Sequence, residues 1–157
     1  MSDETATSEM SIDGFVLRGD LAYEMSSHMW VDIRSDSTVR IGMDPLGLET
    51  AGTLAQLQFV EPGDSVARGE AFGSLEAEKF VGPLVAPLSG TIVAVNTAAM
   101  TDPGIVERSP YDDGWLVEMT PTALAREIET LARGADPISE QFSIRVAEYR
   151  RDGILAE

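Results

Sequence analysis

Residues 73–90 read Gly-Ser-Leu-Glu-Ala-Glu-Lys-Phe-Val-Gly-Pro-Leu-Val-Ala-Pro-Leu-Ser-Gly, and this stretch decides the fold. Short apolar runs at 71–75 and 84–86 flank a Gly82-Pro83 turn signal, which predicts two strands joined in a hairpin. Lys79 is predicted to lie near the tip of that hairpin. An exposed lysine on a rigid turn is accessible to a modifying enzyme and can present a long attached group.

Lys79 is the only lysine of the protein, and the other ten basic side chains are all arginine. A guanidinium stays charged, whereas a lysine amine can lose its proton and be acylated. The plain alternative is an arginine-preferring composition with one stray surface lysine. The predicted hairpin favours the other interpretation, in which this position requires an amine.

Motifs on both sides of the hairpin keep the order and spacing found in one known family. They are His28-Met29-Trp30-Val31, Ile41-Gly42-Met43, Glu76-Ala77-Glu78-Lys79, Ala86-Pro87-Leu88-Ser89-Gly90, Val93-Ala94-Val95-Asn96 and the run from Pro110 to Leu116. Through them the chain resembles, from His28 to about Thr120, the lipoyl-carrying H-protein of the glycine cleavage system. That family places its lipoyl-lysine three residues after a Glu and before an Ala-Pro-x-Ser-Gly turn, which maps onto Lys79.

This resemblance implies a mainly β fold, a lipoyl-domain-like β-sandwich (barrel-sandwich hybrid) with C-terminal helices. It also implies lipoate joined by an amide to Lys79, attached by a lipoate ligase or lipoyl transferase. Glu76 and Glu78 are candidate recognition residues for that enzyme, and the plain alternative is that they keep the tip soluble. The arm's disulfide would supply redox chemistry that a cysteine-free chain lacks.

The resemblance further implies a cycle of three partner enzymes. A pyridoxal-phosphate glycine decarboxylase loads an aminomethyl group onto the arm, and a folate-dependent aminomethyltransferase removes it. A dihydrolipoyl dehydrogenase then reoxidises the dithiol. The protein is accordingly expected to be a carrier and a substrate of these enzymes, and no enzyme itself.

Departures from the family pattern leave other functions open. The run from Glu78 to Pro83 lacks the small and polar residues that commonly follow the lysine, and the tail after residue 120 is longer than usual. H-protein-like lipoate-binding proteins that serve a heterodisulfide-reductase-like sulfur-oxidising complex are one divergent branch. A biotin carrier is disfavoured, because that class usually has Met on both sides of its lysine. A binding or scaffold module with an unmodified lysine is the third alternative.

Composition narrows the classes of function and of partner that remain. With 27 acidic against 11 basic residues the net charge is −16, which disfavours a nucleic-acid partner because a phosphate backbone needs a basic surface. No apolar run is long enough for a transmembrane helix or a secretory signal. One His and no Cys argue against a transition-metal site. We expect a cytoplasmic monomer without a membrane partner.

The chain divides into three predicted segments. Residues 1–12 are polar and acidic and are predicted to be a disordered tail. Residues 13–120, with short strands between Gly and Pro turns, form the predicted lipoyl-carrier domain. Residues 121–157 form a predicted helical extension packed on that domain.

Local signals predict the helices. Asp44-Pro45 is a helix start, and Asn96 is predicted to cap another short helix. In the extension, Thr120-Pro121 predicts a helix that ends at Gly134, and Asp136-Pro137 begins a second. A separate group, interpreted as structural and not catalytic, comprises His28, Trp30 and Trp115.

Overall fold

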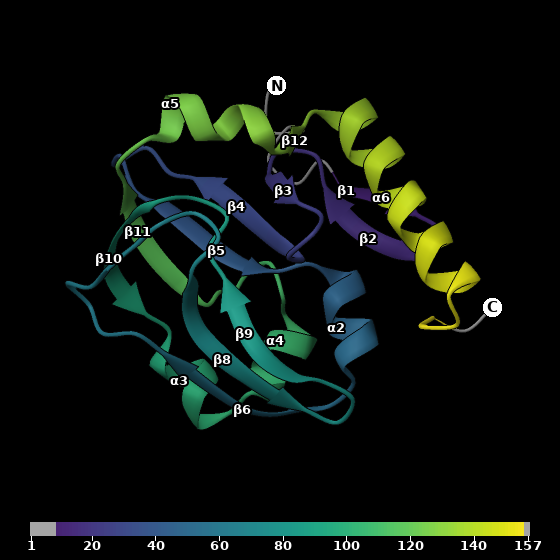
Figure 1. Ribbon diagram of the computed structural model, residues 1–157, viewed down its shortest axis with the longest axis horizontal. Coiled ribbons are helices and arrows are strands. Elements are labelled where there is room, and N and C mark those ends of the chain that lie inside the picture. The colour runs from purple at the N-terminus through teal and green to yellow at the C-terminus, as the bar shows by residue number, and fades with distance from the viewer. Residues whose placement is uncertain (1–8, 156–157) are drawn as a thin grey trace.

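The computed structural model of the protein describes residues 9–155, and its body is built of strands, with helices at the margins (Figure 1). The strands are β1 (Glu9–Ile12), β2 (Phe15–Arg18), β3 (Ala22–Glu24), β4 (Met29–Ile33), β5 (Val39–Met43), β6 (Leu54–Phe59), β7 (Ser65–Val66), β8 (Ala71–Ala77), β9 (Val81–Val85), β10 (Gly90–Val95), β11 (Val117–Pro121) and β12 (Ala132–Arg133). The helices are α2 (Pro45–Ala51), α3 (Thr97–Thr101), α4 (Gly104–Arg108), α5 (Leu124–Glu127), the 3-10 turn η1 (Ile128–Thr130) and α6 (Ala135–Arg151). Within residues 9–155, no helix combines the length and apolarity needed to cross a membrane.

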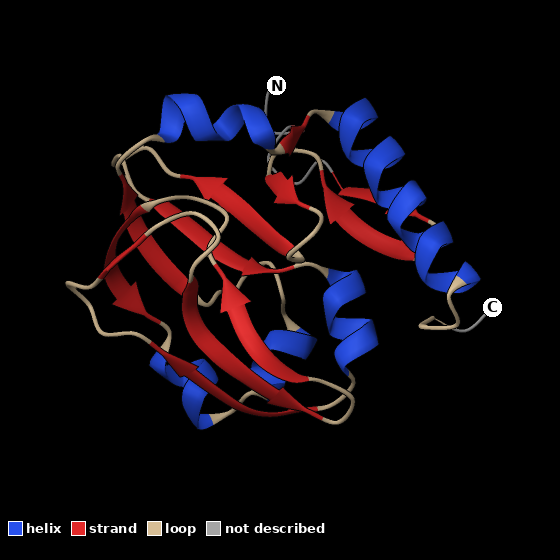
Figure 2. Ribbon diagram, in the orientation of Figure 1, coloured by secondary structure: helices blue, strands red, loops and turns tan. Residues whose placement is uncertain are grey.

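Three antiparallel sheets organise the strands, drawn in red in Figure 2. The largest has the order β12-β3-β4-β5-β11-β10-β7, the second is β6-β8-β9, and β1 pairs with β2. One apolar cluster joins the two larger sheets, with Ile41 and Met119 from the first and Leu57, Phe72 and Leu84 from the second. Buried side chains shared between two sheets make a β-sandwich, so the expected mainly β class is confirmed.

A second apolar cluster holds α6 against the N-terminal strands. Ile138, Phe142 and Val146 recur every fourth residue on α6 and are buried with Leu17 of β2. The expected disordered tail is therefore wrong for residues 9–12, because β1 pairs with β2 and its Ile12 joins this cluster. Residues 1–8 lie outside the described part of the chain.

Two predicted turn and helix signals belong to strands instead. Gly82-Pro83 lies inside β9, where proline is tolerated because β9 is the edge strand of its sheet. Thr120-Pro121 ends β11, since Thr120 pairs with Thr91 of β10. The helix expected from there to Gly134 is reduced to α5 and η1, and the chain becomes extended again at Leu131.

The helix-start signals had different outcomes. Asp44 is the N-cap of α2 as predicted, with its side chain accepting a hydrogen bond from the Gly47 backbone N–H at 2.8 Å. Asn96 precedes α3, but its side chain does not cap that helix. Its Nδ2 instead donates to the carbonyls of Asp113 at 2.8 Å and Trp115 at 2.6 Å. The second helix of the extension, α6, begins at Ala135 and confirms the signal at 136–137.

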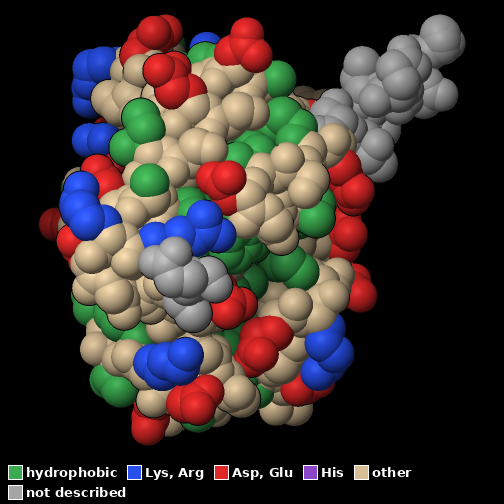
Figure 3. All heavy atoms as spheres, turned by 90° about the vertical axis from the view of Figure 1, so that its right-hand side faces the viewer, with side chains coloured by type: hydrophobic (Ala, Val, Ile, Leu, Met, Phe, Trp, Pro, Cys, Tyr) green, Lys and Arg blue, Asp and Glu red, His purple; other side chains and the backbone are tan. Residues whose placement is uncertain are grey.

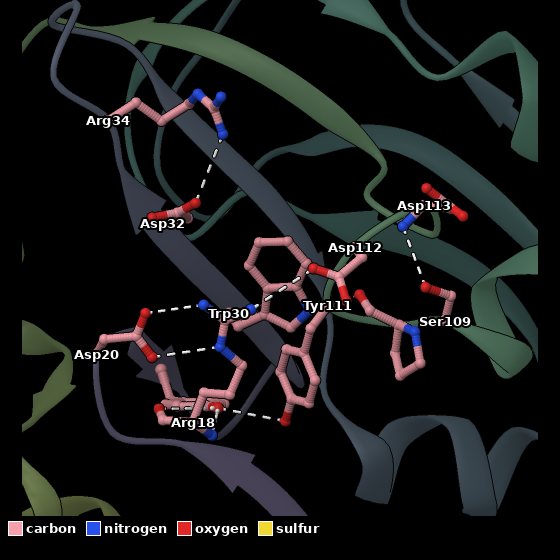
Figure 4. Close-up of polar contacts among 11 residues, drawn as sticks. Arg18, Asp20, Trp30, Asp32, Arg34, Ser109, Tyr111, Asp112 and Asp113 are labelled. Carbon is pink, nitrogen blue, oxygen red and sulfur yellow. Dashed lines mark hydrogen bonds and ion pairs between the residues drawn. The ribbon is translucent and has the colours of Figure 1, made fainter. Parts of the chain in front are cut away.

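A cluster around Tyr111 attaches the N-terminal hairpin to the sandwich (Figure 4). The Tyr111 hydroxyl donates to the Val16 carbonyl at 2.9 Å and lies 3.2 Å from the Tyr23 hydroxyl. Trp30, which is buried, donates from Nε1 to the Pro110 carbonyl at 3.2 Å. The expected core role of Trp30 is confirmed, and these contacts give the run at 110–116 a structural function.

Burial of this cluster predicts a loss of stability at alkaline pH. Desolvation raises the pKa of Tyr23 to about 12 and raises the pKa of Tyr111 as well. Tyrosines in the unfolded chain ionise near pH ~10. At a pH between the ordinary tyrosine pKa and the raised pKa of the folded protein, the unfolded state loses protons that the folded state keeps. The free energy of unfolding therefore falls as pH rises through this range. Urea unfolding at several pH values measures the effect, and a folded protein whose three tyrosines all ionise near the ordinary pKa would contradict it.

Gly42 of β5 lies directly against the indole ring of Trp30 of β4. The two residues are paired across the strands, and a Cβ at Gly42 would collide with the buried indole ring. We expect Gly42→Ala to lower the free energy of unfolding by about 1–3 kcal/mol through overpacking. Gly104→Ala is the matched control in urea unfolding, because its Cβ would meet only the ends of the exposed side chains of Arg108 and Asp102. Equal effects of the two substitutions would refute the steric explanation.

Candidate functional site

Lys79 lies in the turn between β8 and β9, and its side chain is exposed. The turn is closed by a hydrogen bond from the Ala77 N–H to the Phe80 carbonyl at 2.8 Å. Two further bonds attach it to the end of α2: the Lys79 N–H donates to Ala51 at 2.8 Å, and the Glu78 N–H donates to Thr53 at 2.9 Å. The hairpin tip and the end of α2 accordingly lie side by side (Figure 1). The backbone at Lys79 is fixed while its amine remains free to be modified.

Gly52 allows this close approach. It ends α2 with φ 81°, in the left-handed region that glycine adopts most easily, and its N–H donates to the Leu48 carbonyl at 3.2 Å. The Glu78 carboxylate lies against it, so that a Cβ at Gly52 would come within 2.8 Å of Glu78 Oε1. The same Oε1 accepts a hydrogen bond from the Thr53 N–H at 3.3 Å.

The two acidic residues before the lysine therefore have different surroundings. Glu78 is turned toward Thr53 and the end of α2, which gives it a structural contact that the sequence did not signal. Glu76 is at the end of β8, where it lines a shallow hollow of about 250 Å³ with Gln56 and Val81. Both side chains are exposed on the hairpin, and their role in recognition stays a prediction.

A cavity of about 440 Å³ opens beside Lys79, which is one of its lining residues. It lies between α2, the β8–β9 hairpin, the start of β4 and the end of α6, and hydrophobic side chains gather near the middle of this side of the molecule (Figure 3). Its apolar wall consists of Met29, Met43, Ala51, Leu75, Phe80, Pro83, Leu84, Val85 and Ile154. An apolar concavity of this size is typical of a ligand site.

His28 belongs to the polar part of the wall, which also includes Ser26, Ser27, Thr50, Lys79 and Tyr149. Its Nε2 lies 2.7 Å from the Tyr149 hydroxyl, and its Nδ1 lies 3.4 Å from Oδ1 of the buried Asp44. The His28 backbone has φ 63°, and its carbonyl accepts the Asp44 N–H at 2.8 Å. The expected structural hydrogen bond of this histidine is present, and the same ring faces the cavity.

Tyr149 and Ile154 also line the cavity, and sequence reasoning missed this role for both. Both follow the regular apolar face of α6, and no local motif marks either of them. Their place beside Lys79 results from the packing of α6 on the N-terminal strands, about seventy residues from the hairpin in sequence. Trp115, expected to be structural, is partly buried under the guanidinium of Arg40 at 4.7 Å.

Gly52 and Gly63 provide a matched test of how α2 supports the tip. Both have positive φ, 81° and 99°, but a Cβ would meet Glu78 at the first and nothing within 4 Å at the second. Alanine at either position costs about 1–2 kcal/mol of backbone strain. We expect Gly52→Ala to cost about 1 kcal/mol more than Gly63→Ala in urea unfolding, because the hydrogen bond between Glu78 and Thr53 is lost as well. A larger effect at Gly63 would show that the contact with Glu78 is unimportant.

Comparison with known proteins places these features in one family. The family model described as glycine cleavage H-protein matches residues 21–140. Glycine cleavage system H protein 3 of Aquifex aeolicus is 34% identical over 139 residues, which cover 87% of this chain and 86% of that protein. The H protein of Gloeobacter violaceus is 35% identical over 130 residues, covering 83% and 90% of the two chains.

A solved structure agrees with the sequence comparisons. The crystal structure of a glycine cleavage system H protein from Mycobacterium marinum superposes with a TM-score of 0.67 at 35% identity. The match covers 88% of this chain and all of that one. Because the family model spans most of the sequence and the fold agrees, this chain is a member of the glycine cleavage H-protein family.

Proposed function

We propose that Lys79 carries lipoate in amide linkage and that the protein is a swinging-arm carrier in glycine cleavage. The observation that carries this proposal is the sole lysine of the chain, held on a fixed hairpin tip at the mouth of an apolar cavity. Membership of a family of lipoyl carriers supports the same function. The protein would act as a substrate of its partner enzymes and would catalyse no step itself.

The residues present fit a lipoyl group. The Lys79 amine is exposed, and among residues 9–155 no carboxylate lies within ion-pair distance of it, so acylation breaks no salt bridge. Lipoate supplies a hydrocarbon chain and a redox-active disulfide. The apolar wall that begins at Lys79 offers such an arm a surface on which to pack between visits to other proteins.

The hairpin offers a contact surface for partners. Phe80 and Val81, directly after the lysine, leave 44% and 75% of their surface exposed. Apolar side chains beside the modified residue suit docking by a lipoate ligase or lipoyl transferase, with Glu76 and Glu78 as polar contacts. The further partners in this proposal are glycine decarboxylase, aminomethyltransferase and dihydrolipoyl dehydrogenase, acting on a cytoplasmic monomer.

One observation favours a second candidate pathway. Among residues 9–155, sixteen residues line the cavity, and none of these is Asp or Glu. An aminomethyl group on a thiol is a cation near neutral pH, and burying a cation without a counter-charge is costly. A lipoyl arm that carries no aminomethyl group, as expected of one that serves a heterodisulfide-reductase-like complex, does not bring this cation into the cavity. Glycine-dependent aminomethyl loading of the lipoylated protein distinguishes the pathways, since it is expected only in glycine cleavage.

Intact mass and peptide mapping after co-expression with a lipoate ligase test the carrier function. We expect the mass of one lipoyl group, localised to Lys79, in essentially all of the protein. Lys79→Arg keeps the positive charge but cannot be acylated, so the increment should disappear. In the control Lys79→Arg/Arg126→Lys, the new amine replaces an 80% exposed guanidinium on α5 and should stay unmodified. An unmodified Lys79 in the presence of a competent ligase would refute the proposal.

A further inference from the structure

Glu78 is joined to Thr53 by two hydrogen bonds that run in opposite directions. The Glu78 N–H donates to the Thr53 carbonyl at 2.9 Å, and Glu78 Oε1 accepts the Thr53 N–H at 3.3 Å. Between residues 9 and 155, this carboxylate is the one acceptor of the Thr53 N–H. The side chain of Glu78 therefore adds a third bond to the two main-chain bonds that attach the hairpin tip to the end of α2.

The bond between the carboxylate and Thr53 forms where α2 ends. Gly52 has no Cβ, which leaves room for the Glu78 side chain directly before Thr53. The bond is exposed, so water can replace it when the carboxylate is removed. Its loss should loosen the tip without unfolding the sandwich, whose core lies elsewhere.

The two glutamates before the lysine are not equivalent in this respect. The Glu76 side chain lines the hollow beside Gln56 and, within the described part of the chain, makes no hydrogen bond. The Glu78 carboxylate instead accepts a backbone N–H from a segment 25 residues away in sequence. A role exerted through Thr53 requires an oxygen acceptor at position 78, but it does not require a negative charge there.

We propose that Glu78 is a positioning residue for the acylation of Lys79, which acts by holding the backbone of the tip against Thr53. This inference rests on the proposed lipoylation of Lys79. Because Lys79 follows Glu78 directly and its own N–H donates to Ala51, the conformation of one residue restricts that of the other. The carboxylate serves as a hydrogen-bond acceptor in this role and touches neither the reacting amine nor the lipoate.

The chemistry of acylation explains why the position of the tip matters. The neutral Lys79 amine attacks the carboxyl carbon of an activated lipoate, a C–N bond forms, the bond to the activating group breaks, and the amine releases one proton. A fixed backbone reduces the orientational freedom that must be lost when the amine meets that carbon. If only a fraction of the chains holds the tip correctly, the apparent affinity of the attaching enzyme falls by that fraction.

Backbone amide hydrogen exchange tests the positioning before any lipoate is attached. We expect Glu78→Ala to lower the protection factor of the Lys79 N–H about threefold, because a net loss of about 0.7 kcal/mol, within the range of one hydrogen bond, corresponds to that factor. Glu78→Gln keeps an oxygen acceptor and should retain most of the protection. Glu49→Ala is the matched control, because Glu49 is exposed on the same helix α2 and, within residues 9–155, its side chain makes no bond to the tip. Protection factors correct for the intrinsic exchange rate of each sequence.

The kinetics of a lipoate ligase test whether the positioning is used. With the unlipoylated protein as varied substrate, Glu78→Ala should raise KM about threefold and leave kcat nearly unchanged, since the bound tip is held by the enzyme. Glu78→Gln should restore most of the KM, and Glu49→Ala should match the unaltered chain. An enzyme that read the charge of Glu78 would respond equally to alanine and glutamine at this position.

The outcomes separate this inference from the proposed function. Absence of the lipoyl mass increment on the unaltered chain overturns both. Full lipoylation with equal KM values for Glu78→Ala and Glu78→Gln overturns only the positioning role, and so does unchanged protection of the Lys79 N–H in Glu78→Ala. Lower protection and a higher KM in Glu78→Ala, both restored by Glu78→Gln, support it.

Discussion

The hydrogen bonds between the hairpin tip and the end of α2 are the constraint on which the site depends. A turn at the tip of a two-stranded hairpin has no neighbour to restrict it, but here the backbone of Lys79 donates to Ala51 and that of Glu78 to Thr53. Side chains of β8 pack in the sandwich core, and the backbone at the end of α2 is hydrogen-bonded to the tip. Because the main chain makes these bonds, the lysine side chain does not have to contribute to them. Its amine can be consumed by modification without loss of the support that positions it.

The support of the tip depends in turn on the capping of α2. Asp44 at the start and Gly52 at the end determine the length of this helix, and thus the position of the Ala51 carbonyl. Asp44 also faces His28, so one buried carboxylate contributes to the hairpin support and lies behind the His28 ring, which lines the cavity. The two sides of the site are coupled through a single short helix.

The features that the sequence predicted are those that depend on neighbouring residues. Short apolar runs indicated β8 and β9, and the helix-start signal at Asp136-Pro137 indicated α6. The turn predicted at Gly82-Pro83 was wrong, because proline is tolerated inside β9. That tolerance depends on β9 being an edge strand, which is a property of the whole sheet and not of the local sequence. Lys79 was still placed near the tip, since a strand was predicted on each side of it, although the second strand begins three residues earlier than predicted. The cavity could not be predicted, because it joins His28, the hairpin and Tyr149, which no local pattern relates.

Under the proposed function the reactive chemistry belongs to a cofactor, and the protein determines where that cofactor is attached. The hairpin tip meets this requirement through backbone bonds that do not depend on what the lysine carries. The cavity beside it is lined by side chains from the start of β4 and the end of α6 as well as from the hairpin. Support of the tip and lining of the cavity thus involve different parts of the chain. Substitutions at Tyr149 or Ile154 can therefore alter the cavity wall while the hairpin, the helix that supports it and the core of the sandwich stay the same.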